Sequence, residues 1–175
     1  MDKIQFLLNL VTIAFLLMAG AVAFNIGLKK REGAWYFTSG VFVLSGINKI
    51  FDFDNMVGSW FLADGIEFIN WANRTLPWLR LYKQPGFIVD FLFLIAGVAA
   101  VLAIYKRMRR DILSYSFFAA GVVSFLGVIF IGFCLAGVIG AAFQANGLQM
   151  IKDTLESAGA LCFFAAFLSF NRITF

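Results

Sequence analysis

The chain contains no histidine among its 175 residues. Histidine ligates haem, copper and zinc, and it is the base of Ser-His-Asp and Cys-His catalysis. Its absence excludes those sites within this chain. A glycine-rich nucleotide-binding loop is also missing. We therefore expect a protein that is not an enzyme and that has no cofactor or metal of its own.

Charged residues are scarce, at 14% of the chain, whereas hydrophobic residues make up 62%. An average globular protein is about 25% charged and about 45–50% apolar. From Ile112 to Ile151, 40 consecutive residues carry no charged side chain. A bilayer accommodates such a segment, because one helical crossing needs about 20 apolar residues. The composition therefore predicts a single-domain integral membrane protein.

Cysteine and proline are rare, at two residues each. Cys134 and Cys162 lie within apolar runs, where we expect them to be small packing residues. Neither proline interrupts an apolar run, so the broken helices typical of many transporters are not expected.

The apolar runs predict an all-α bundle of about five transmembrane helices, at residues 4–28, 34–51, 87–105, 115–143 and 154–171. Within the connection 52–86, residues 57–76 have a narrow polar stripe between apolar side chains, which is typical of a helix lying flat in the outer interface. Asp153 and Glu156 are expected to cap the start of the last helix.

The basic residues predict an orientation. Seven of the 14 Lys and Arg residues lie in the short connections 29–31 and 106–110. The positive-inside rule places both connections in the cytoplasm of a plasma or bacterial inner membrane, with the N-terminus outside and the C-terminus inside. This distribution explains the net charge of +4 without nucleic acid as a partner. Tryptophan and tyrosine, including Trp35, are expected near the interfaces.

Two sets of residues are candidates for contact with partners. Small residues at four-residue spacing allow helices to approach closely, and aromatic residues of the outer connection suit lipid headgroups or a partner subunit. The small residues are Ala19, Ala23 and Gly27 in the first helix and Gly132, Ala136 and Gly140 in the fourth; the aromatic residues are Trp60, Phe61, Trp71 and Trp78.

Lys49 and Asp90 lie just inside the outer ends of two predicted helices, at the same depth. Each side chain either reaches the headgroups alone, or the two form an ion pair that is structural or lines a small outer pocket.

These features favour a non-catalytic accessory or scaffold subunit of a larger membrane complex. Its small-residue faces and many of its 23 phenylalanines would pack against other membrane subunits, lipids or pigments. The alternative is a membrane sensor or ligand-binding module that uses the outer connection. A small-molecule or lipid transporter or enzyme comes third, because the last three predicted helices carry no charge at mid-depth.

Overall fold

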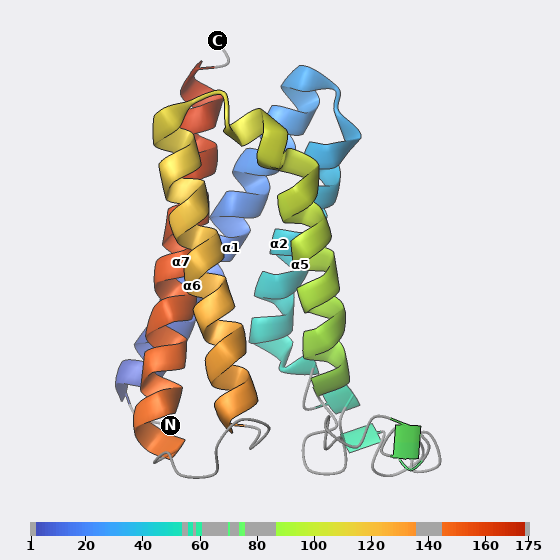
Figure 1. The fold of residues 1–175 in the computed structure, drawn as a ribbon, viewed down its shortest axis with the longest axis vertical. Coiled ribbons are helices and arrows are strands. Elements are labelled where there is room, and N and C mark those ends of the chain that lie inside the picture. The colour runs from blue at the N-terminus through green and yellow to red at the C-terminus, as the bar shows by residue number, and fades with distance from the viewer. Residues whose placement is uncertain are drawn as a thin grey trace.

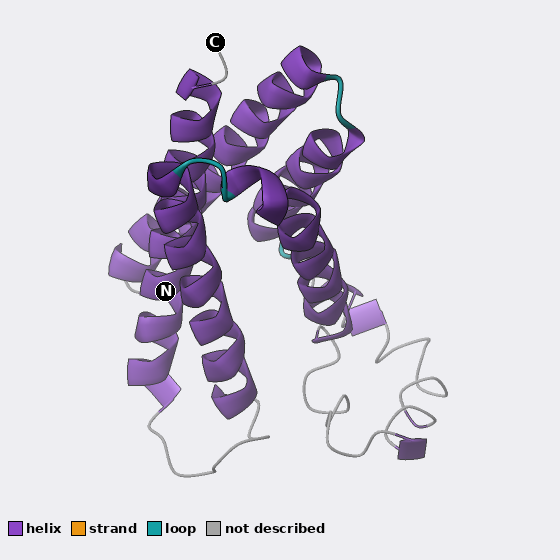
Figure 2. Ribbon diagram, turned by 45° about the horizontal axis from the view of Figure 1, so that its top comes forward, coloured by secondary structure: helices purple, strands orange, loops and turns teal. Residues whose placement is uncertain are grey.

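The computed structural model describes residues 3–53, 56–57, 59–60, 70, 74–75, 87–135 and 145–173. Five helices make up the main part of it: α1 (Lys3–Lys30), α2 (Gly33–Phe51), α5 (Phe87–Met108), α6 (Ile112–Leu135) and α7 (Ala145–Ile173). Figure 2 shows helices, with short loops between α1 and α2 and between α5 and α6, and no strand in this described part. The predicted all-α class is therefore confirmed.

Three of these helices are long and apolar enough to cross a membrane: Lys3–Lys30, Ile112–Gly132 and Gly147–Ile173. The α2 helix has 19 residues. At a rise of about 1.5 Å per residue it is about 28 Å long, close to the thickness of a hydrocarbon core.

The helices form an open ring in the order α5, α2, α1, α7, α6. The α6–α7, α1–α2 and α1–α7 interfaces are extensive, and the α2–α5 interface is smaller. Helices α5 and α6 share the least extensive of these interfaces, although they follow each other in sequence. Figure 1 shows α5 and α6 descending from their connecting turn as separate legs, with α1 and α2 behind them. The ring is therefore closed at one end and open along the seam between α5 and α6.

Both basic connections lie at the upper end of the bundle in Figure 1, together with the C-terminal end of α7. The end of α1 turns at Arg31, a left-handed residue with φ 52°. Arg107 of α5 donates to the Glu32 carboxylate beside this turn, over 2.5 Å, and Lys29 donates to the side chain of Asn171. The basic end is thus tied across α1, α5 and α7.

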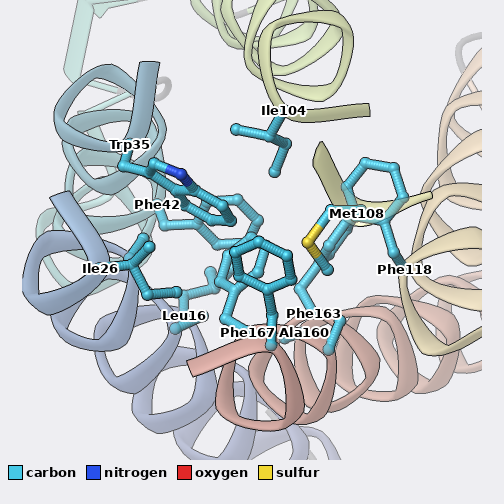
Figure 3. Packing of buried hydrophobic residues seen from close by; sticks show 14 residues of the cluster. Leu16, Ile26, Trp35, Phe42, Ile104, Met108, Phe118, Ala160, Phe163 and Phe167 are labelled. Atoms are coloured by element: carbon cyan, nitrogen blue, oxygen red, sulfur yellow. The ribbon is translucent and has the colours of Figure 1, made fainter. Parts of the chain in front are cut away.

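A hydrophobic core fills the upper half of the bundle (Figure 3). Trp35 is fully buried and stacks on Phe170 with ring centroids 5.2 Å apart. Phe42 packs edge-to-face against Phe163 and Phe167. Trp35 points into the bundle, because Phe167 and Phe170 of α7 face α2. Its predicted depth near the membrane interface stays a prediction.

Three predicted helix boundaries differ from the structure by three residues or more. The third helix ends at Met108 and not at residue 105. The last helix begins at Ala145 and not at residue 154, so Asp153 is an interior helical residue and not an N-cap. The fourth helix begins at Ile112 and not at residue 115, because the Asp111 carboxylate accepts the Ser114 backbone N–H at 2.7 Å and caps α6. The predicted continuation of that helix over 136–143 lies outside the described residues.

Candidate functional site

A cavity of about 400 Å³ lies inside the open seam. Its walls come mainly from α2, α5 and α6, and α1 and α7 contribute to it as well. Phe93 and Val101 of α5 face Phe125 and Ile129 of α6 across this space. Ligand pockets typically have volumes of about 300–1,000 Å³. The cavity is therefore large enough to hold a small organic molecule or part of a lipid.

The cavity is apolar over most of its length and polar at one end. Its polar lining residues are Thr12, Ser45, Asn48, Lys49, Lys152 and Glu156. They come from the early part of α1, the late part of α2 and the early part of α7. All three stretches lie toward the lower end of the bundle in Figure 1, away from the basic connections. The cavity therefore runs from a polar mouth to an apolar interior.

An ion pair between α2 and α7 dominates the polar end. The Lys49 ammonium lies 2.5 Å from the Glu156 carboxylate, and the exposed fractions of the two side chains are 30% and 11%. A charge placed among apolar helices is costly unless it is paired. The pair therefore satisfies Glu156, which has little access to solvent, and ties α2 to α7 across the ring.

A second polar group packs behind this ion pair, between α1 and α7. The hydroxyls of Thr12 and Ser157 lie 2.8 Å apart and both are buried. Ser157 also donates to the Leu8 carbonyl at 3.1 Å. On the same face of α7, Gln149 donates to the Asp153 carboxylate at 2.9 Å. These bonds fix the register of α1 against α7 and hold the Asp153 carboxylate, which does not line the cavity.

Two polar groups at the cavity lack a partner. Lys152 forms no ion pair or hydrogen bond with any residue that the structure describes. The Asn48 side-chain oxygen is buried, and within the described ranges it accepts no hydrogen bond. Buried polar atoms of folded proteins nearly always have partners, and an exception calls for a physical explanation. Both groups line the same cavity.

The predicted Lys49–Asp90 pair stays a prediction, because the side chain of Asp90 lies outside the described residues. The structure does show a partner that sequence reasoning missed, Glu156. Glu156 had been assigned to the first turn of the last helix, whereas α7 begins well before it. The spacing of Lys152 and Glu156 by four residues, on one helical face, was the available signal.

The small residues of α1 lie inside the bundle. Ala19 and Ala23 have no exposed surface, and Gly27 is buried against α2, where an added Cβ would lie 3.1 Å from the Tyr36 ring. They therefore serve packing within this chain. Gly132 lines the cavity, and an added Cβ there would meet nothing within 4 Å. Ala136 and Gly140 lie outside the described residues.

Of the outer aromatic residues, Trp60 is described, and its side chain is 55% exposed. Phe61, Trp71 and Trp78, with most of the predicted interfacial helix 57–76, lie outside the described residues. Cys134 and Cys162 are free thiols.

The chain matches no protein-family model, and no curated protein or solved structure is significantly similar to it. Function is therefore inferred from the cavity and the residues that line it.

Proposed function

We propose that this protein is a non-catalytic membrane-embedded helical bundle that binds an amphipathic, lipid-like molecule in the cavity between α5 and α6. The observation that carries the proposal is the distribution of polar and apolar side chains in one cavity of about 400 Å³. Apolar side chains line most of its length, and polar groups lie at one end. Ligand pockets are typically apolar with a few polar groups that fix orientation. An amphiphile has the matching division into a chain and a head.

The open seam supports entry from the side. Val98 and Leu102 of α5 and Leu126 of α6 line the cavity and are also exposed at the surface of the bundle. In a bilayer these faces would contact acyl chains, so a lipid-like ligand would reach the cavity without crossing water. The depth of the polar end fits as well, because a lipid head stays near the interface while its chain points toward the bilayer centre.

The membrane arrangement that we propose has all five helices crossing the bilayer, the N-terminus outside and the C-terminus in the cytoplasm of a plasma or bacterial inner membrane. Supporting it, both basic connections and the C-terminal end of α7 lie at one end of the bundle. The positive-inside rule assigns that end to the cytoplasm.

Blocking the cavity tests the binding proposal. Gly97 lines the cavity and an added Cβ would meet nothing within 4 Å, so Gly97→Leu places a side chain in the ligand space without a local clash. Gly40→Leu is the matched control, because Gly40 of α2 has the same open surroundings and does not line the cavity. The wild-type chain and the control should retain bound amphiphile through purification in mild detergent, as seen by native mass spectrometry, and Gly97→Leu should lose it. Equal retention by all three chains would refute the proposal.

A subunit of a larger membrane complex is the second candidate function. The observation that favours it is the same seam, since a helix of another chain placed against α5 and α6 would cover their exposed apolar faces. Crosslinks from α5 and α6 to one stoichiometric partner, with no small molecule retained, would favour this reading over ligand binding.

A further inference from the structure

We infer that the cavity selects an amphiphile with a single aliphatic chain and an anionic oxygen head, a carboxylate or a phosphate, and that Lys152 binds the head. This inference rests on the proposed function and adds the chemistry of the ligand to it.

The charges of the residues that line the cavity favour an anionic head group. Among the residues that the structure describes, three charged side chains line the cavity: Lys49, Lys152 and Glu156. Lys49 and Glu156 neutralise each other in their ion pair. Lys152 is left with an ammonium group that has no hydrogen-bond or ion-pair partner in the described part of the chain. Its sequence neighbour Asp153 is buried, accepts from Gln149 and does not line the cavity. Among the described residues, the side chains that line the cavity therefore sum to one positive charge. The nearby Asp153 carboxylate attracts the Lys152 ammonium through space but forms no ion pair or hydrogen bond with it.

The position of Lys152 is suited to binding this head group. Lys152 precedes Glu156 by one helical turn, so it lies about 6 Å nearer to the start of α7 and to the end of the bundle. It therefore stands at the polar end of the cavity, outside the ion pair. An ammonium group at this place would donate charge-assisted hydrogen bonds to a carboxylate or phosphate oxygen.

Asn48 provides an independent indication of a polar head. Its side-chain oxygen is buried at the cavity and accepts no hydrogen bond from the described residues. A hydroxyl of a phosphate or glycerol head would donate to this oxygen, and rotation of the amide would turn its NH₂ toward a carboxylate. Either contact satisfies an oxygen that the described residues leave without a hydrogen bond.

The apolar wall fits one chain. The lining of α5 runs from Phe93 to Leu102, which corresponds to about 14 Å along the helix axis. A second acyl chain of a diacyl lipid would have to leave the cavity through the seam between α5 and α6. A single-chain amphiphile therefore matches the space between the helices.

Competition binding tests the head-group chemistry. The purified full-length chain is loaded with a fluorescent fatty acid, which is then displaced by palmitate, hexadecyl phosphate or hexadecanol. The last is a neutral competitor with the same chain. Because a hydrogen bond to a charged group contributes about 1.5–3 kcal/mol, we expect the anionic competitors to bind about tenfold or more tightly than hexadecanol. The preferred anion identifies the head as carboxylate or phosphate.

Three variants assign this preference to Lys152. Lys152→Met should remove the advantage of the anionic competitors and leave hexadecanol binding unchanged, whereas Lys152→Arg should retain the advantage. Lys3→Met is the matched control, because Lys3 is an exposed lysine at the same end of the bundle and does not line the cavity. Equal binding of all competitors to the wild-type chain, or an unchanged preference in Lys152→Met, would overturn the inference.

The two proposals fail in different ways. If Gly97→Leu abolishes binding but the head group has no effect, the cavity binds amphiphiles and the assignment of Lys152 is wrong. If Gly97→Leu binds the fluorescent fatty acid as the wild-type chain does, the binding site itself is wrong.

Discussion

Glu156 brings a negative charge to a place between helices where only 11% of its side chain is exposed. Lys49 lies opposite with 30% of its side chain exposed, and its long aliphatic stem lets the ammonium reach toward the head-group region. The two partners therefore differ in their access to solvent. Glu156 depends on Lys49 for its stability in the bundle, whereas Lys49 has another route to a polar environment.

This inequality predicts an asymmetric double-mutant cycle. Lys49→Met leaves a buried carboxylate without its partner and should destabilise the bundle by an amount approaching about 3–5 kcal/mol. Glu156→Leu should cost less, and the double variant should recover much of the loss caused by Lys49→Met. Thermal unfolding in detergent gives the three values and the coupling between them. Additive effects would show that the ion pair does not contribute.

The pair between Arg107 and Glu32 is an internal control for this cycle. Its side chains are 36% and 37% exposed. Exposed ion pairs contribute about 1 kcal/mol or less. Removing either residue should therefore change the unfolding temperature much less than Lys49→Met does.

Helix α1 approaches α2 closely enough to require glycine. A Cβ added to Gly20 would lie 2.7 Å from Val43 Cγ2 and 3.3 Å from the Ser39 backbone oxygen. The second contact involves backbone, which cannot move away without shifting α2. Gly20 therefore sets the distance between the first two helices.

Gly20→Ala should destabilise the bundle by about 1–3 kcal/mol, the usual cost of overpacking. Gly40→Ala provides the comparison, because an added Cβ at Gly40 meets nothing within 4 Å. That change should be neutral or stabilise by up to about 1 kcal/mol, since alanine has the higher helix propensity. Thermal unfolding of the two variants in the same detergent measures the difference. A Gly20→Ala variant as stable as the wild-type chain would show that the helices separate freely.

The cap of α6 predicts a dependence on pH. Hydrogen bonding to Ser114 lowers the pKa of the Asp111 carboxyl below its ordinary value. The folded state thus favours the carboxylate, and the stabilisation is present above the ordinary pKa of about 3.9. It is lost as the pH falls through the lowered pKa.

Asp111→Asn keeps a capping side chain but removes this titration. The difference in unfolding temperature between neutral and acidic pH should therefore be smaller in Asp111→Asn than in the wild-type chain. An identical pH profile in the two proteins would exclude Asp111 as a contributor.

The helices themselves were predictable from sequence, because runs of apolar residues without charge have few alternatives to a helix in an apolar bundle. The start of α7 was not. Residues such as Gln149, Lys152 and Asp153 look like a loop or a helix start in one dimension. In the fold, the same helix places Glu156 against Lys49 and Ser157 against Thr12, which come from distant parts of the chain. The cavity was equally hidden, because it depends on how far α5 and α6 diverge.

At the scale of the whole molecule, the two ends of the bundle differ, because both basic connections lie at the same end. Arg109 is exposed beside the basic turn between α5 and α6, and Ser59 is exposed in the connection after α2. The proposed topology places these residues on opposite sides of the membrane.

Cysteine labelling checks that topology. In a chain in which Cys134 and Cys162 are replaced by alanine, Ser59→Cys should react with a membrane-impermeant maleimide in intact cells. Arg109→Cys should react only after the membrane is permeabilised. Reaction of both positions from the same side, or of Arg109→Cys in intact cells, would contradict the arrangement.

The order of helices in the ring has a consequence for biogenesis. Helix α7 leaves the ribosome after the other four described helices, yet it packs against both α1 and α6 and supplies Phe163, Phe167 and Ser157 to the interior. Until it arrives, Thr12 of α1 lacks its Ser157 partner and Lys49 lacks Glu156. The nascent bundle is therefore incomplete until α7 has been translated, and a truncated chain without α7 should be a substrate for membrane quality control.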